Sequence, residues 1–242
     1  MFAYRAKAQR TTCAAVSLTA VMAFCFGAYA ADKEEKPKSE HIDFVMKHNI
    51  GKEGKTLPEG EFVEEKHWET SDFYGQGKVT LNGDTVVIGT GNDMTGIRWN
   101  GPLAKMNYEI TLDAQRTEGS DFFCALTFPY NDDPCSLILG GWGGRLVGLS
   151  SLDNLDASEN GSASWRDFDN GKWYYIRLRV TPKKIEAWID EQQVIDETTE
   201  GHKIGIRWEV EKSRPLGIAT WQTTGSIRNV KMRAFPAEAP QP

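Results

Sequence analysis

Apolar and polar residues alternate with a period of two along much of the chain between residues 78 and 235. The segment 107–116 shows this best, because Tyr108, Ile110, Leu112 and Ala114 share one face and the residues between them are polar or charged. Such alternation is typical of a strand with one buried face. We expect further strands at 78–81, 85–88, 122–128, 136–139, 173–180, 185–189, 194–196, 217–221 and 227–235.

Turn signals separate these strands about every ten residues, as in an all-β sandwich. Asn82-Gly83-Asp84 joins the first two strands, and Asn-Gly is the strongest short hairpin signal because both residues tolerate positive φ. Helical periodicity is absent, and no repeat of the propeller or solenoid kind occurs. The pattern predicts an all-β protein built as an antiparallel β-sandwich.

The first 30 residues have the features of an export signal. Arg5, Lys7 and Arg10 precede an apolar run at about 13–26, and Ala28-Tyr29-Ala30 matches a cleavage site. The alternative is a membrane anchor, but the run is short for a span of about 20 residues. We therefore predict export to the periplasm, the cell surface or the medium. The expected organisation is a signal peptide at 1–30, a charged flexible segment at 31–60, a sandwich domain at 61–235 and a disordered tail at 236–242.

The charge of the mature chain limits the classes of partner. The formal net charge is −6, and removal of Arg5, Lys7 and Arg10 with the signal makes it −9. An acidic protein without a basic patch is not expected to bind nucleic acid or anionic membranes.

Residues 121–144 contain the two cysteines that follow the predicted signal, Cys124 and Cys135. A hairpin centred on the turn at 129–134 places Cys124 opposite residue 139 and Cys135 opposite residue 128. The two cysteines are then about 13 Å apart along the ladder, whereas a disulfide needs Cα atoms within about 7 Å. An exported protein favours a Cys124–Cys135 disulfide, which would require an asymmetric loop. Both alternatives stay open at this point.

The same stretch contains a candidate metal loop and a glycine-flanked tryptophan. Asn131, Asp132 and Asp133 can ligate calcium, although such a run is also common in turns and calcium needs six or more oxygens. The run from Gly140 to Gly144 lacks the Lys-Ser/Thr ending of a phosphate loop. We expect these glycines to bend the backbone and leave the indole of Trp142 open, and we expect no metal and no cofactor.

Eight tryptophans follow the predicted signal, and several stand beside a polar residue. Sugar rings stack on aromatic faces while a few placed polar groups bind their hydroxyls. The alternative for each tryptophan is packing in the core of the sandwich. We expect at least two of them to line a carbohydrate-binding groove, with candidates Arg98, Trp99, Trp142, Trp165, Arg207, Trp221 and Gln222.

Catalytic patterns are sparse. The four histidines suggest no catalytic triad, because three of them lie at residues 41–67, in or near the charged N-terminal segment. Acid–base cleavage of a glycoside needs two carboxyl groups about 5 to 9 Å apart, which on one strand means positions i and i+2. Glu209 and Glu211 have this spacing on a strand expected at 204–210. Their alternative role is a solvated strand edge.

Two segments resemble a known family. The first runs from Gly171-Lys-Trp-Tyr-Tyr-Ile-Arg to Ile185-Glu-Ala-Trp-Ile-Asp; the second runs from Gly217-Ile-Ala-Thr-Trp-Gln to Gly225-Ser-Ile-Arg-Asn-Val. Both are similar to the 3-keto-disaccharide hydrolase domains, which are secreted concanavalin A-like jelly rolls. The family often continues the second segment with Asp-His-Gly, where this chain has Thr223-Thr224-Gly225.

The resemblance implies a jelly-roll fold and a reaction on a 3-keto sugar. A 3-keto group acidifies the neighbouring ring C–H, so one general base can start glycosidic cleavage. Glu209 and Asp113 are the candidates for that base. The expected function is an exported glycan-directed domain, for which the resemblance implies 3-keto-disaccharide hydrolysis. The alternatives are a non-catalytic carbohydrate-binding module and a laminin-G-like interaction domain.

Overall fold

A computed structural model describes residues 68–101 and 103–235. The predicted signal peptide, the charged segment and the tail lie outside these residues. None of the helical segments that the structure describes has the length and hydropathy needed to cross a membrane.

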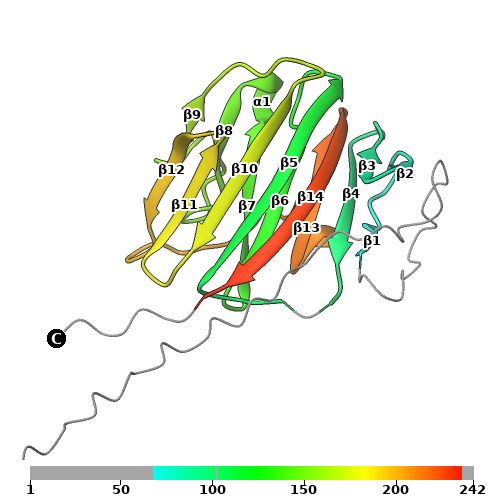
Figure 1. The fold of residues 1–242 in the computed structure, drawn as a ribbon. Coiled ribbons are helices and arrows are strands. Elements are labelled where there is room, and N and C mark those ends of the chain that lie inside the picture. The colour runs from blue at the N-terminus through cyan, green and yellow to red at the C-terminus, as the bar shows by residue number, and fades with distance from the viewer. Residues whose placement is uncertain (1–67, 102, 236–242) are drawn as a thin grey trace, which may run out of the picture. The chain divides into compact units, whose positions relative to one another are not determined.

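Within the described residues, the chain forms two antiparallel sheets of seven strands each, so the predicted all-β sandwich is confirmed (Figure 1). Sheet A has the order β12 (Gln192–Thr198), β11 (Lys184–Ile189), β10 (Trp173–Val180), β5 (Tyr108–Glu118), β14 (Thr224–Ala234), β3 (Thr85–Ile88) and β2 (Val79–Asn82). Sheet B has the order β1 (Trp68–Thr70), β4 (Met94–Trp99), β13 (Leu216–Trp221), β6 (Cys124–Tyr130), β7 (Asp133–Gly140), β8 (Leu146–Ser150) and β9 (Ser164–Trp165).

The core between the sheets follows from the period-two pattern. The apolar residues of β5, from Tyr108 to Ala114, are all buried, and they belong to one cluster with residues of both sheets. The β2–β3 hairpin also forms as expected: Asn82 pairs with Thr85, and Gly83 takes a φ of 63° in the two-residue turn. Alternating burial therefore directs one face of each strand to the shared core.

One predicted strand is wrong. Residues 204–210 do not form a strand. The segment instead enters a 3-10 helix, η1 (Trp208–Ser213), whose first turn is closed by a hydrogen bond from the Val210 N–H to the Arg207 carbonyl at 3.2 Å. Because the segment is not extended, Glu209 and Glu211 do not share a strand face, and Glu211 pairs with Arg214 at 2.7 Å instead.

The expected hairpin register is present, and it leaves both cysteines unpaired. Cys124 lies opposite Leu139, and Cys135 lies opposite Phe128. Four residues of ladder, about 13 Å, therefore separate the cysteines, and both are free and buried. Burial raises the pKa of each thiol to about 12. The Cys124–Cys135 disulfide, which the predicted export favours, is therefore absent. Both cysteines are protonated thiols in the core.

The outer face of sheet B, which points away from sheet A, is also partly apolar. On β7, Leu137 and Leu139 enter the core between the sheets, so Ser136 and Ile138 lie on this outer face. A second apolar cluster packs here, including Phe122, Ile138, Val210 and other buried residues. The segment η1 and the loop before β9 thus cover part of the outer face of sheet B.

Candidate functional site

A cleft of about 270 Å³ opens on the outer face of sheet B. Its lining comes from β4, β7, β8, β13, η1 and the residue before it, the segment just before β6, and the short turn labelled α1 (Gly141–Gly144). The cleft has three parts: an aromatic end, a row of hydroxyl groups and a charged wall.

The aromatic end contains Phe122, Trp142 and Trp221. Trp221 packs beside Phe122 with ring centroids 6.3 Å apart, while the Trp142 side chain is 40% exposed. Trp142 stands in a left-handed turn with a φ of 47°, and Gly140 and Gly143 beside it also have positive φ. The glycines thus supply the sharp bend that leaves the indole at the mouth of the cleft.

Asp121 fixes this turn. One oxygen of its carboxylate accepts a hydrogen bond from the Gly143 N–H at 3.1 Å, and the other accepts one from the Phe122 N–H at 2.7 Å. Backbone N–H groups bonded to a carboxylate are strong, charge-assisted contacts. Asp121 therefore ties the segment before β6, which carries Phe122, to the turn that carries Trp142.

A row of hydroxyl groups crosses the floor of the cleft. Ser150 on β8 lies opposite Ser136 on β7, which lies opposite Thr127 on β6. The Ser136 and Thr127 hydroxyls are 2.9 Å apart and hydrogen-bonded. The Ser150 hydroxyl lines the cleft, is buried, and has no hydrogen-bond partner among the described residues. A buried hydroxyl without a partner is costly unless a ligand or water binds it.

The charged wall is formed by Arg207 and Glu209. The Arg207 guanidinium donates to the two Glu209 carboxylate oxygens at 3.1 and 2.5 Å, and to the Asp156 carboxylate at 2.8 Å. Its hydrogen bond and charge lower the pKa of Glu209, and Glu209 in turn raises the pKa of Arg207. Glu209 is therefore held ionised and is a weak base.

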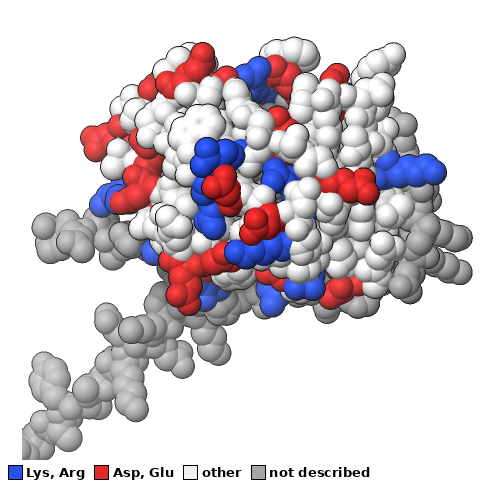
Figure 2. Space-filling view, turned by 90° about the horizontal axis from the view of Figure 1, so that it is seen from above, with Lys and Arg blue, Asp and Glu red and all other residues white. Residues whose placement is uncertain are grey.

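The charges of the cleft are mixed and nearly balanced. Its acidic and basic lining residues are Asp121, Glu209 and Arg207, two acidic and one basic. At the end of the sandwich that carries α1, acidic and basic side chains are likewise interspersed (Figure 2). Such a site has no feature that attracts a strongly anionic ligand.

Four of the predicted site residues meet in the cleft: Trp142, Trp221, Arg207 and Glu209. Three others lie on or next to the same sheet but do not line the cleft. Trp165 is exposed on the edge strand β9, Arg98 forms an ion pair with the buried Glu69, and the Gln222 amide donates to the Asn92 carbonyl at 2.9 Å.

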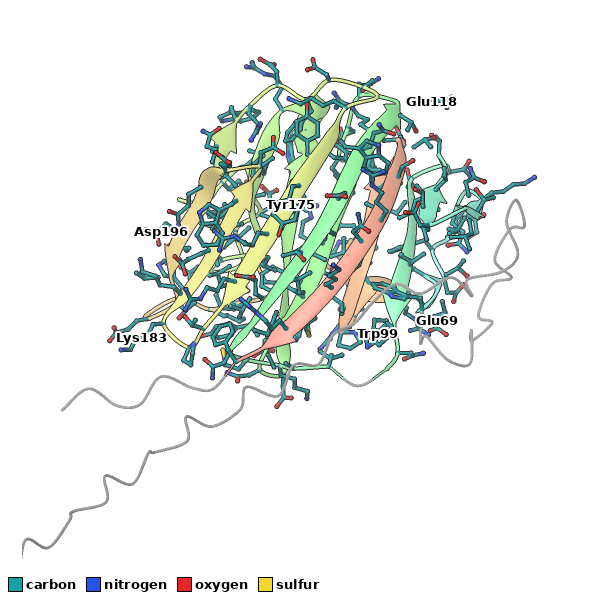
Figure 3. All side chains as sticks on the ribbon, in the orientation of Figure 1. Glu69, Trp99, Glu118, Tyr175, Lys183 and Asp196 are labelled. Atoms are coloured by element: carbon teal, nitrogen blue, oxygen red, sulfur yellow. The ribbon has the colours of Figure 1, made fainter. Side chains whose placement is uncertain are left out.

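The remaining two predicted residues lie elsewhere. Trp99 is in the core between the sheets, edge-on to Trp68 with ring centroids 5.4 Å apart; Figure 3 labels Trp99 on β4 near Glu69 on β1. Asp113 lies on the outer face of sheet A, where it accepts hydrogen bonds from Arg228 at 3.1 Å and Asn229 at 2.7 Å. Neither residue reaches the cleft, so we leave both out of the site.

Sequence analysis missed Asp121, Ser136 and Ser150. The segments 122–128 and 136–139 are apolar enough to be read as strands buried on both faces, which concealed that one face of β7 opens to the cleft. Asp121 acts through backbone N–H groups of a turn, and no residue spacing signals that contact. At the other candidate loop, Asp132 pairs with Lys105 at 2.6 Å, which lowers the pKa of Asp132. The described residues include no group of three or more His, Cys, Asp or Glu side chains arranged to hold a metal ion.

Comparisons with solved structures show a likeness of fold to known proteins. The exoplasmic/lumenal domain of VIP36, in a form bound to Ca²⁺ and mannose, has a TM-score of 0.51 and 12% identity, covering 73% of this chain and 86% of that one. The carbohydrate-binding module CBM66 from Bacillus subtilis has a TM-score of 0.45 and 15% identity, covering 69% of this chain and 96% of that module. At this level of identity the VIP36 likeness concerns the fold alone. No curated protein gives a significant match to the chain.

The family resemblance noted in the sequence is confirmed over more than half of the chain. The matching family model spans residues 94–233, from β4 to β14, and includes most of the strands that line the cleft. The chain therefore belongs to the family of 3-keto-alpha-glucoside-1,2-lyase-like domains.

Proposed function

We propose that the cleft on the outer face of sheet B binds a neutral carbohydrate. The observation that carries this proposal is the indole of Trp142, 40% exposed at the mouth of a cleft that also offers hydroxyl and carboxylate groups. A sugar ring stacks its C–H face on such an indole. A volume of about 270 Å³ is near the lower end of small-molecule sites, at roughly 300 Å³.

The polar lining supports a neutral ligand that carries hydroxyl groups. The unpartnered Ser150 hydroxyl can donate to or accept from a sugar hydroxyl, and the free lone pairs of Asp121 and Glu209 can accept from others. The two carboxylates disfavour a uronic acid or a sulfated sugar, because like charges repel in a partly desolvated site. Ligand recognition thus combines one stacked ring with a few hydrogen bonds.

Membership of the family favours a second candidate function, cleavage of a 3-keto-glucoside in the same cleft. In that reaction a base removes the proton from C2, next to the C3 carbonyl. The electron pair forms the C1–C2 double bond, the C1–O bond breaks, and the leaving oxygen takes up a proton. Asp121 and Glu209 are the carboxylates that line the cleft. Asp121 is the stronger candidate for the base, because the Arg207 guanidinium lowers the pKa of Glu209.

The two functions are separated by measuring binding and turnover together. Unmodified disaccharides of glucose and their 3-keto derivatives are tested by calorimetry and by a cleavage assay, on the wild type, Trp142→Ala and Asp121→Asn. We expect the wild type to bind and Trp142→Ala to lose about tenfold in affinity. Turnover that Asp121→Asn abolishes would establish the enzyme, and binding without turnover would establish a binding module. Absence of both from the wild type would contradict the proposal and favour a laminin-G-like interaction domain.

A further inference from the structure

The aromatic end of the cleft continues toward the edge of sheet B. On β9, Trp165 lies directly opposite Leu146 of β8, and Leu146 belongs to the apolar cluster on the outer face of sheet B. Residues directly opposite each other in an antiparallel pair project from the same face. Trp165 therefore stands on the same face as the cleft, although it does not line it.

The exposed rings are spaced along one line across the strands. Gly141, next to Trp142, is bridged to Leu146, and Leu146 pairs with Trp165. Since neighbouring strands are about 4.8 Å apart, the backbones at Trp142 and Trp165 are about 10 Å apart. On the other side, the Trp221 N–H donates to the Phe122 carbonyl at 3.1 Å. We call these four residues, Trp221, Phe122, Trp142 and Trp165, the aromatic strip.

The surroundings of the strip indicate what it can bind. Trp142 is 40% and Trp165 is 58% exposed, and near the strand β8 Arg145, the residue before Leu146, pairs with Asp167 at 2.7 Å. A protein partner needs a continuous apolar patch at the core of its interface, which two exposed rings about 10 Å apart do not provide. A glycan chain suits this arrangement, because each of its units presents an apolar ring face between polar hydroxyls.

We propose that the aromatic strip binds an extended glucan chain, with one unit in the cleft and a later unit stacked on Trp165. This inference rests on the proposed carbohydrate binding and adds that the ligand is an oligosaccharide rather than a single sugar. The choice of glucose as the repeating unit follows from the glucoside named by the family.

The test compares chain lengths. Calorimetry is run with the α-1,4, β-1,4 and β-1,3 glucose disaccharides and the matching hexasaccharides, on the wild type and on Trp165→Ala and Trp165→Phe. The matched control is Tyr175→Ala. Like Trp165, Tyr175 is an exposed aromatic residue of a strand, with 45% of its surface exposed, but it lies on sheet A (Figure 3). Circular dichroism checks that each variant is folded.

We expect the wild type to bind at least one hexasaccharide about tenfold more tightly than its disaccharide. Trp165→Ala should remove this gain without changing disaccharide affinity, whereas Trp165→Phe and Tyr175→Ala should keep it. Equal affinities for both lengths in the wild type, or an equal loss on both lengths in Trp165→Ala, would overturn the inference. If disaccharides bind and depend on Trp142 while no length gain occurs, only this inference fails. If the wild type binds neither length, the proposed function fails with it.

Discussion

Both outer faces of the sandwich carry tryptophans, but the side chains around those tryptophans differ between the two faces. On the outer face of sheet A, the Arg177 guanidinium lies 3.6 Å from the centre of the Trp188 ring, and Arg228 lies 4.1 Å from that of Trp173. On the outer face of sheet B, the Trp142 indole is open and no such stack on it occurs among the described residues. The protein's own arginines thus cover the tryptophan rings Trp173 and Trp188 of sheet A, while Trp142 on the outer face of sheet B remains available to a ligand.

A network of ion pairs explains why sheet A holds its arginines in place. Glu109 pairs with both Arg177 and Arg233 at 3.4 Å, and Asp113 pairs with Arg228 at 3.1 Å. Each carboxylate orients a guanidinium, and two of these guanidiniums lie over a ring. A tryptophan on a sheet surface is therefore a ligand site only when its cross-strand neighbours leave it uncovered.

The largest expected effect comes from removing one half-buried tryptophan on each face. Trp221→Ala and Trp188→Ala should each lower the free energy of unfolding by about 2–3 kcal/mol, because each loses a packed indole. Only Trp221→Ala should also weaken disaccharide binding. Urea unfolding and calorimetry measure the two quantities, and an equal loss of affinity in Trp188→Ala would break the distinction between the faces.

The next effect concerns the Asp121 carboxylate, which ties the Trp142 turn to the segment before β6. Asp121→Ala removes the acceptor for the Gly143 and Phe122 N–H groups, so we expect a loss of about 2 kcal/mol in the binding free energy. Asp113→Ala, which removes a paired carboxylate on sheet A, should leave the affinity unchanged. Calorimetry on both variants checks this, and a larger loss from Asp113→Ala would argue against the cleft as the site.

A smaller effect is expected at the hydroxyl row. Ser150→Ala should cost about 1 kcal/mol in binding and should not lower stability, because the hydroxyl has no partner among the described residues to lose. Ser213→Ala is the matched control, since its hydroxyl is also buried and unpartnered there but lies outside the cleft. Wild-type affinity in Ser150→Ala would remove this row from the site.

The smallest effect is a pH dependence at the charged wall. The ordinary pKa of a glutamate is 4.5, and in the folded protein the pKa of Glu209 is lower, mainly because of its hydrogen bond with Arg207. The ion pair therefore stabilises the fold fully above pH 4.5. This stabilisation is lost as the pH falls through the lowered pKa of the folded state. We expect Glu209→Gln to be about 0.5 kcal/mol less stable than the wild type at pH 7, with the gap closing below pH 4.5. Urea unfolding at several pH values measures the difference in free energy of unfolding between the two proteins. A difference that stays constant with pH would show that the ion pair does not stabilise η1.

The period-two pattern predicted most of the fold. Burial alternates along long strands such as β5 and β10. The sequence therefore predicted which face of each strand is buried and approximately where each strand begins and ends. The strands β1 and β9 have three and two residues and cannot display a period. The segment at 204–210 was predicted as a strand, but it enters a 3-10 helix where Arg207 and Glu209 bond to each other over a two-residue separation.

The candidate site was only partly predictable, and the reason lies in which residues become neighbours. The sequence prediction pairs the Trp99 ring with the adjacent Arg98 side chain in one binding groove, yet successive residues of a strand point to opposite faces. Trp99 consequently lies in the core while Arg98 pairs with Glu69. The arginine–tryptophan pairs that do form join residues on different strands, such as Arg228 and Trp173. The exposure of Trp142 was predictable because the glycines around it indicate a bend in the backbone, and this signal does not depend on how the strands pair.

The most direct test follows the indole N–H signals by NMR during titration with the glucose disaccharide that binds most tightly. The account predicts that the signals of Trp142 and Trp221 shift with the bound fraction, while those of Trp173 and Trp188, covered by arginines on sheet A, stay in place. Shifts confined to Trp173 and Trp188, or no shift at Trp142 at saturation, would contradict it.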